Sequence, residues 1–277
     1  MKWSKKIRRR GRRRWLMGAF MAMCLSVASS AAPTPTPTDP LHDLLDRTST
    51  QVSKFLDQFS DTKCTEQVLQ EKFKPNGKLE YKEQSTFDYL VILTNAGGEL
   101  SLAESRLAVR VHNHGKNDKV PSLLISNGFA TLFLVFHPYY ANSFQFTDAG
   151  PDTIGGLKLE KIQFQHVRDM RSPAALALRG REFPLEIAGT AWVDVQSGMI
   201  VKIEAGVGRS LEDVGLKTLR SEVIYAPVPF KGMDKTYWYP QQAIVEVETP
   251  RQHWRNTHKF TDYKRFSVST EEKVAEK

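Results

Sequence analysis

The fold class follows from residues 189–204, which read GTAWVDVQSGMIVKIE. Thr190–Val195 and Ile200–Ala205 each have the pattern of a β-strand, and the residues between them, Gln-Ser-Gly at 196–198, are a turn signal. Strands joined by so short a connection pair in the antiparallel sense, because parallel pairing needs a long crossover. This stretch therefore predicts an antiparallel sheet.

Further strand candidates lie on both sides of this hairpin. Leu79–Leu93 alternates clearly, with Phe87 and Tyr89 on one face and Thr86 and Asp88 on the other. Many strands at short spacing, without long βαβ units, predict a mainly β (α+β) fold rather than a parallel α/β fold. The remaining candidates are Val68–Phe73, Glu99–Val111, Phe144–Thr147, Leu157–Val167, Phe183–Ile187, Leu219–Tyr225, Lys235–Val247 and Gln252–Val268.

Three helices are expected among these strands. Asp39 can cap the first, Pro40 suits its first turn, and apolar residues recur at helical spacing as far as Phe59. The very apolar stretch Pro121–Pro138 is predicted to form a buried helix. Ser172–Leu178 is expected to be one short capped helix.

The amino-terminal residues 1–32 have the order of a secretory signal peptide. Nine cations and no anion fall within residues 2–14, an uncharged apolar stretch covers residues 15–28, and small residues follow. The apolar stretch is short for a spanning helix, which needs about 20 residues. We expect export to a periplasmic or extracellular location, with an uncleaved leader that anchors the chain as the alternative.

The rest of the chain is expected to form one folded domain. The alternating Pro-Thr residues at 33–38 predict an extended spacer, because proline disfavours helix and central strand. This folded domain is assigned to residues 39–268, and the charged residues 269–277 to a frayed tail. This mature domain is not expected to span a membrane.

The charge balance argues against a nucleic-acid partner. The whole chain has 39 basic and 31 acidic residues, giving a formal net charge of +8. Nine basic residues lie in the first 30 positions, which leaves 30 basic against 31 acidic residues after cleavage. A net charge near −1 does not indicate a nucleic-acid-binding surface.

Cysteine usage gives no sign of a structural disulfide. Of the two cysteines, Cys24 lies in the leader and Cys64 in the domain, so a bridge within the mature chain is impossible. Cys64 is expected to be a half-buried small residue, with a disulfide to another chain as the alternative.

The order of these elements resembles a known family. A strand that ends in Asp194, a tight turn, a strand that carries Lys202 and Glu204, and a later Trp-Tyr-Pro strand at 238–240 resemble the outer-membrane lipoprotein carrier and receptor (LolA/LolB-like) superfamily. The resemblance implies a strongly curved antiparallel half-barrel sheet whose concave face is covered by a few helices. The chain is also similar to exported bacterial proteins that share the stretch 251–256, Arg-Gln-His-Trp-Arg-Asn.

The fold implied by this resemblance offers an apolar hollow for a ligand. Acyl chains enter such a hollow because each buried methylene contributes about 0.8 kcal/mol. The alternative is that the aromatic residues simply fill the core. The candidate wall residues are Phe129, Phe133, Phe136, Phe164 and Trp192.

Two polar sites are also candidates. Arg251, His253 and Arg255 share one face of a strand and could hold a carboxylate or phosphate, unless these cations pair with Glu246 or Glu248. His137 could line a pocket mouth, unless it marks a helix terminus packed on the sheet. His253 and His258 point to opposite faces of a regular strand, so a shared metal ion would need a bulge. Asp194 is expected to bond backbone amides in its turn rather than to act as a base.

Local catalytic motifs are missing from the sequence. It contains no Gly-x-Ser-x-Gly, phosphate-binding loop, His-Glu-x-x-His or Cys-x-x-Cys. No catalytic residue, metal site or cofactor is therefore predicted. The expected function is non-enzymatic binding of a hydrophobic ligand in the cell envelope: an acyl chain, a lipid or a lipoprotein. The alternatives are an interaction subunit of an envelope protein complex and a hydrolase whose site is assembled only in three dimensions.

Overall fold

A computed structural model describes residues 39–96, 99–109, 128, 132–178, 181–208, 215–230 and 236–266. The chain divides into two units, Met1–Pro37 and Thr38–Lys277, and all of the described residues belong to the second unit. The predicted leader, spacer and charged tail lie outside the described residues.

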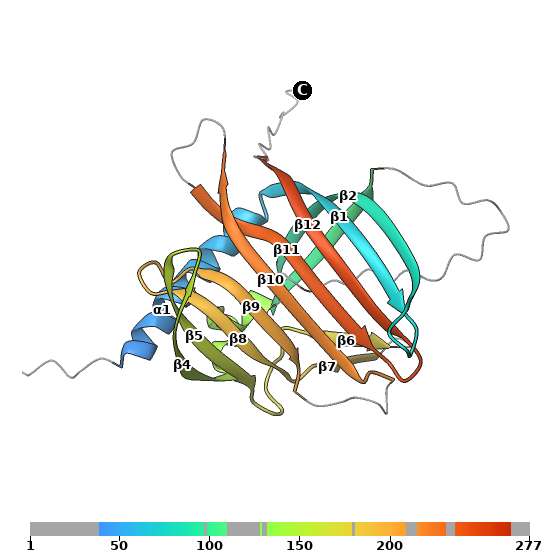
Figure 1. The fold of residues 1–277 in the computed structure, drawn as a ribbon. Helices are drawn as coiled ribbons and strands as arrows, with labels where there is room; N and C mark the ends of the chain where they lie inside the picture. The colour runs from blue at the N-terminus through green and yellow to red at the C-terminus, as the bar shows by residue number, and fades with distance from the viewer. Residues whose placement is uncertain are drawn as a thin grey trace, which may run out of the picture. The chain divides into compact units, whose positions relative to one another are not determined.

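One antiparallel sheet of ten strands dominates this unit (Figure 1). Their spatial order is β3-β2-β1-β12-β11-β10-β9-β8-β5-β4, and the sheet curls without closing into a barrel. The predicted fold class and curved half-barrel are therefore confirmed. The strands are β1 (Thr62–Phe73), β2 (Leu79–Ala96), β3 (Glu99–Ala108), β4 (Phe144–Ile154), β5 (Leu157–His166), β8 (Ile187–Asp194), β9 (Ile200–Val207), β10 (Thr218–Pro229), β11 (Thr236–Glu248) and β12 (His253–Arg265).

The long helix α1 (Pro40–Phe59) covers the concave face of this sheet. It begins as the sequence predicts, with the side chain of Asp39 accepting a hydrogen bond from the Leu41 amide at 3.1 Å. Its apolar stripe is buried against the sheet, and Phe59 at its end is 1% exposed. Burial of this stripe, more than intrinsic helix propensity, stabilises a helix of this kind.

The turn between β8 and β9 touches α1. Gly198 has φ +73, and a Cβ built there would lie 2.9 Å from the Cβ of Arg47 and 3.0 Å from the Thr48 amide nitrogen. Glycine is therefore needed at this position both for its backbone conformation and for the close approach of the helix.

The single helix predicted over Pro121–Pro138 is wrong where the structure describes it. Phe133–Phe136 form a 3₁₀ turn, η1, and a second short helix, α3 (Pro138–Ala141), follows. His137 between them is extended, with φ −71 and ψ 140, because the residue before a proline avoids helical geometry. Except for Gly128, residues 121–131 lie outside the described residues.

The helix predicted over Ser172–Leu178 is also wrong. Ala175–Leu178 form strand β6, which pairs with β7 (Arg181–Pro184) in a separate two-stranded sheet. The hydroxyl of Ser172 donates to the Leu185 carbonyl at 2.7 Å instead of capping a helix. Tertiary pairing thus overrides the helix propensity of the alanines and leucines. The strand predicted over Phe183–Ile187 is split between the end of β7 and the start of β8.

Candidate functional site

The concave face of the sheet has two chemically different halves. Under α1 lies an aromatic cluster centred on Phe55, whose ring is 4.7 Å from that of Phe133 and 5.0 Å from that of Phe59 between centroids. Tyr225 and Tyr239 approach the same ring from the sheet, at 6.1 and 5.9 Å. We call this group the aromatic half of the face.

The aromatic half is packed, and a small cavity lies at the seam between α1 and the sheet. The cavity has a volume of about 30 Å³. Sites for drug-sized ligands usually measure about 300–1,000 Å³, so this cavity has no room for an acyl chain. It is lined by Gln51, Val52, Phe55, Phe133, Met199, Ile200, Tyr225 and Trp238.

The structure brings three of the five candidate wall residues together. Phe133, Phe136 and Phe164 are each 2% exposed in one hydrophobic core, and the rings of Phe136 and Phe164 lie 5.9 Å apart. Trp192 lies on the outer face, where its indole nitrogen donates to Asp152 at 2.9 Å. Phe129 lies outside the described residues.

His137 lies at a helix terminus. Its Nδ1 accepts a hydrogen bond from the Tyr139 amide at 3.2 Å, so it caps α3. Partial burial lowers the pKa of His137, against an opposing attraction from Asp57. The alternative reading of this residue, a helix end packed on the sheet, fits this geometry.

The other half of the concave face holds a buried ion cluster. The guanidinium of Arg106 donates to both oxygens of Glu66, at 2.6 and 2.9 Å, and to Glu104 at 2.8 Å. His258 Nδ1 hydrogen-bonds to Glu66 at 2.8 Å. The exposed side-chain fractions are 0% for Glu66, 2% for His258, 4% for Glu104 and 8% for Arg106. We call these four residues the charged half.

The two carboxylates of the charged half differ in their acidity. Burial raises the pKa of Glu66, but the hydrogen bonds from His258 and Arg106 outweigh it and lower that pKa overall. For Glu104, burial prevails and raises the pKa, although Arg106 and the Gly128 amide, which donates to it at 2.8 Å, act in the opposite direction. Arg106 also lies over the ring of Tyr89, 5.0 Å from its centroid, which links the two halves.

The sequence analysis missed the charged half entirely. Glu66 and His258 lie on inward positions of β1 and β12. The strand predicted over Val68–Phe73 begins after Glu66, whereas the strand predicted over Gln252–Val268 includes His258. On β1, the polar residues Glu66 and Gln70 point inward, whereas the apolar Leu69 points outward. The alternation of polar and apolar residues therefore does not identify the buried face of this strand. A charged residue flanked on the same face by Cys64 and Val68 is the signal that could have found it.

The outward-facing residues His253 and Arg255 of the Arg251–His258 stretch pack against neighbouring side chains and do not form an open anion site. Arg255 Nε donates to Glu246 at 2.6 Å, and its guanidinium lies 5.5 Å from the centroid of Phe73. His253 packs beside the same ring at 5.2 Å, and Arg251 is exposed in the bend that precedes β12. The pairing alternative with Glu246 is therefore what the structure shows, and the inward His258 and outward His253 point to opposite faces as expected.

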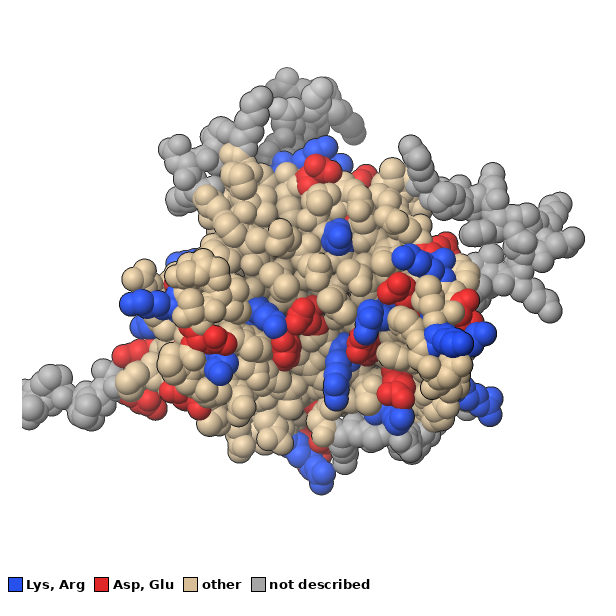
Figure 2. All heavy atoms as spheres, in the orientation of Figure 1, with Lys and Arg blue, Asp and Glu red and all other residues tan. Residues whose placement is uncertain are grey.

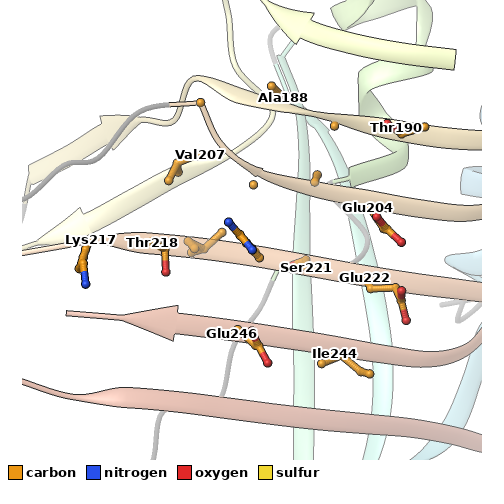
Figure 3. A pocket seen from close by; sticks show the side chains of 16 residues that line it. Ala188, Thr190, Glu204, Val207, Lys217, Thr218, Ser221, Glu222, Ile244 and Glu246 are labelled. Carbon is orange, nitrogen blue, oxygen red and sulfur yellow. The ribbon is translucent and has the colours of Figure 1, made fainter. Parts of the chain in front are cut away.

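The outer face also carries an open groove of about 720 Å³ (Figure 3). Thr190, Glu204, Glu222 and Glu246 line it from four neighbouring strands, β8 to β11. Lys202 next to it binds Glu204 at 2.5 Å and Glu222 at 3.0 Å. Figure 2 shows cations and anions intermixed over this face, as expected of a solvated, self-paired surface.

Asp194 and Cys64 both have structural roles. Asp194 Oδ1 accepts from the amide of Ser197 at 2.7 Å and from its hydroxyl at 2.6 Å, as the turn prediction requires. Cys64 is 4% exposed, more buried than predicted, and burial raises the pKa of its thiol. In the part of the chain that the structure describes, no group of His, Cys, Asp and Glu is arranged to hold a metal ion.

The alternative of a spatially assembled hydrolase required His253 or His137 to bond both a nucleophile and a carboxylate. Neither shows this arrangement within the described ranges: His253 lies beside Phe73, and His137 caps α3. No helix in those ranges has both the length and the hydropathy needed to cross a bilayer.

No protein-family model and no curated protein matches this chain. Among solved structures, one match is a LolA superfamily protein from Nitrosomonas europaea, with 9% identity, a TM-score of 0.37, and coverage of 82% of this chain and 94% of that one. This superfamily is also the one named by the sequence resemblance.

Two further solved structures match. One is a DUF1329 family protein from Desulfovibrio piger, with 12% identity, a TM-score of 0.44, and coverage of 84% of this chain and 96% of that one. The other is a Vibrio parahaemolyticus domain described as outer-membrane lipoprotein-sorting, with 10% identity, a TM-score of 0.40, and coverage of 82% and 94%.

Proposed function

We propose that this chain is an exported, non-enzymatic binding protein of the cell envelope, and that its ligand is an acyl chain, either free or carried by a lipid or lipoprotein. The observation that supports the proposal is the aromatic half, where the amphipathic helix α1, together with Phe133 of η1, covers an aromatic surface on an open sheet. The proposed export rests on the signal-peptide pattern of residues 1–32. The mature domain is the part that would bind.

The two ends of α1 are attached to the sheet differently. At its carboxyl end, the Thr62 hydroxyl donates to the Gln58 carbonyl at 2.9 Å and shares a hydrogen bond with Tyr239 at 3.1 Å. Near its amino end, α1 contributes the apolar side chain of Leu44 and an exposed hydrogen bond from Arg47. In our proposal the helix pivots at its carboxyl end, and the ligand enters at the seam cavity.

The energies allow such an exchange. A ligand would displace Phe55, Phe133 and neighbouring apolar side chains, each of which is stabilised by roughly 1.5–3 kcal/mol through burial. A chain of about twelve methylenes gains about 10 kcal/mol on burial, which offsets the exposure of three or four such side chains. Because the closed cavity is so small, binding and helix displacement are coupled.

Titration of the purified protein with a fluorescent fatty acid tests this proposal. We expect saturable uptake by the wild type and uptake several-fold tighter by Phe55→Leu, because less packing must then be displaced. The matched control is Phe73→Leu on the outer face, which should bind like the wild type. Absence of saturable uptake by all three proteins would refute the ligand. An equal effect of Phe73→Leu would refute the site.

A further inference from the structure

The aromatic half contains a buried tyrosine hydroxyl that the fold itself does not satisfy. Tyr225, on the inward side of β10, is 5% exposed, and its hydroxyl has no hydrogen-bond partner among the described residues. Two tyrosines near it are satisfied: Tyr239 shares a hydrogen bond with Thr62 at 3.1 Å, and the Tyr263 hydroxyl donates to the Pro240 carbonyl. Of these three tyrosines, Tyr225 is the exception.

Packing does not explain this hydroxyl. A buried hydroxyl without a partner destabilises a protein, because folding removes its hydrogen bonds to water and supplies none in return. A phenylalanine at position 225 would keep the ring and its edge contact with Phe55, 6.1 Å away between centroids, without this cost. A hydrogen bond that forms only when a ligand is bound would account for the hydroxyl.

Tyr225 lies where the proposed ligand enters. It lines the seam cavity together with Phe55, Phe133 and Trp238. In the proposed function the ligand displaces Phe55 and Phe133, and it then takes their place beside Tyr225. Because the acyl chain continues under α1, the part of the ligand nearest to this entrance is its head group.

The surroundings of Tyr225 are uncharged. None of the described residues that line the seam cavity carries a charge, and its polar side chains are those of Gln51, Tyr225 and Trp238. Burial raises the pKa of Tyr225, so the hydroxyl stays protonated and can donate. An ionised carboxylate buried here would lack a counter-charge, whereas an ester carbonyl is satisfied by one hydrogen bond.

We propose that the Tyr225 hydroxyl donates a hydrogen bond to the ester carbonyl of the ligand, and that this bond selects esterified acyl chains over ionised fatty acids. The inference rests on the proposed function, since it concerns the same ligand and the same entrance. A fatty acid still binds through its chain, but its carboxylate stays in the solvent and makes no bond with Tyr225. Tyr225 therefore determines specificity and is not only a core residue.

A cycle of two proteins and two ligands tests the proposal. Methyl dodecanoate and dodecanoate are titrated into wild type and Tyr225→Phe at about pH 7.5, where the acid is ionised. Tryptophan fluorescence reports binding, since Trp238 lines the cavity. The wild type should bind the ester about tenfold more tightly than the acid, and Tyr225→Phe should bind the ester about tenfold more weakly than the wild type. The affinity of Tyr225→Phe for the acid should equal that of the wild type.

The matched control is Tyr81→Phe, which removes a hydroxyl that donates to Glu83 and does not line the cavity. It should bind both ligands like the wild type. Because Tyr225→Phe removes an unpaired buried group, it should fold, and thermal melts check this. Equal losses for both ligands in Tyr225→Phe, or no loss for either, would overturn the proposal while the proposed function stands. A wild type that binds neither ligand would refute both.

Discussion

The two halves of the concave face are buried to a similar degree but resist change in different ways. The aromatic half is held by ring contacts between 4.7 and 6.1 Å, which can be exchanged among many partners. The charged half is held by four directional bonds between 2.6 and 2.9 Å, each with a specific donor and acceptor. Apolar packing adapts to a lost group, whereas a buried charge cannot lose its partner without a large cost. The aromatic half is therefore the adaptable part of this face.

Breaking the charged half should have the largest effect. Glu66→Gln leaves the buried Arg106 without its main counter-charge, so the free energy of unfolding should fall by about 4 kcal/mol in urea denaturation. Glu204→Gln removes the same charge from the outer face, where Lys202 is the partner, and should cost about 1 kcal/mol or less. Equal losses would remove the distinction between the two environments.

Acid should reduce this difference. The pKa of Glu66 is lowered from its ordinary value of 4.5, so its stabilising contribution is complete above pH 4.5 and is lost as the pH falls through the lowered value. The stability gap between wild type and Glu66→Gln should therefore shrink below pH 4.5. The pKa of Glu104 is raised, so the folded state disfavours its ionised form. The wild type should therefore lose stability relative to Glu104→Gln as the pH rises above 4.5. Urea melts across pH measure both.

The aromatic half should tolerate substitution better. Phe59→Leu retains most of the apolar volume, and its neighbours can repack, so the expected loss is about 1.5 kcal/mol. Phe73→Leu on the outer face should change stability by less than about 0.5 kcal/mol. If Phe59→Leu cost as much as Glu66→Gln, the aromatic half would not be adaptable.

The smallest expected effect has the opposite sign. The Tyr225 hydroxyl is buried and has no hydrogen-bond partner among the described residues. Tyr225→Phe removes this desolvated hydroxyl and should raise the free energy of unfolding by about 1 kcal/mol. Tyr239→Phe, which removes the hydrogen bond with Thr62, should lower it by about 1 kcal/mol. Thermal melts of the two variants should therefore move in opposite directions.

The local patterns were predictable wherever one rule decided the outcome. The cap at Asp39, the turn acceptor at Asp194 and the alternation along β2 depend on near neighbours in the sequence, and all three are confirmed. Residues 175–178 adopt a strand because β7 lies beside them, which a helix propensity does not reveal.

The candidate site was harder to predict than the fold. The phenylalanines at 133 and 136 were identified by their apolarity alone. Apolarity predicts that a side chain is buried, but not which way it points. Trp192 was misplaced for the same reason, since adjacent strand residues point to opposite faces. The charged half joins residues of three strands that are up to 192 positions apart, and the antiparallel pairing of β12 with β1 brings His258 beside Glu66.

The glycine in the β8–β9 turn determines how closely α1 can approach the sheet. A single carbon at position 198 would meet the Arg47 backbone at 2.9 Å, where no real contact is tolerated. The absence of a side chain at Gly198 thus sets the distance between α1 and the β8–β9 turn. An alanine at this position would push the amino-terminal half of α1 away from the sheet and widen the gap between them, without altering any residue of the aromatic lining.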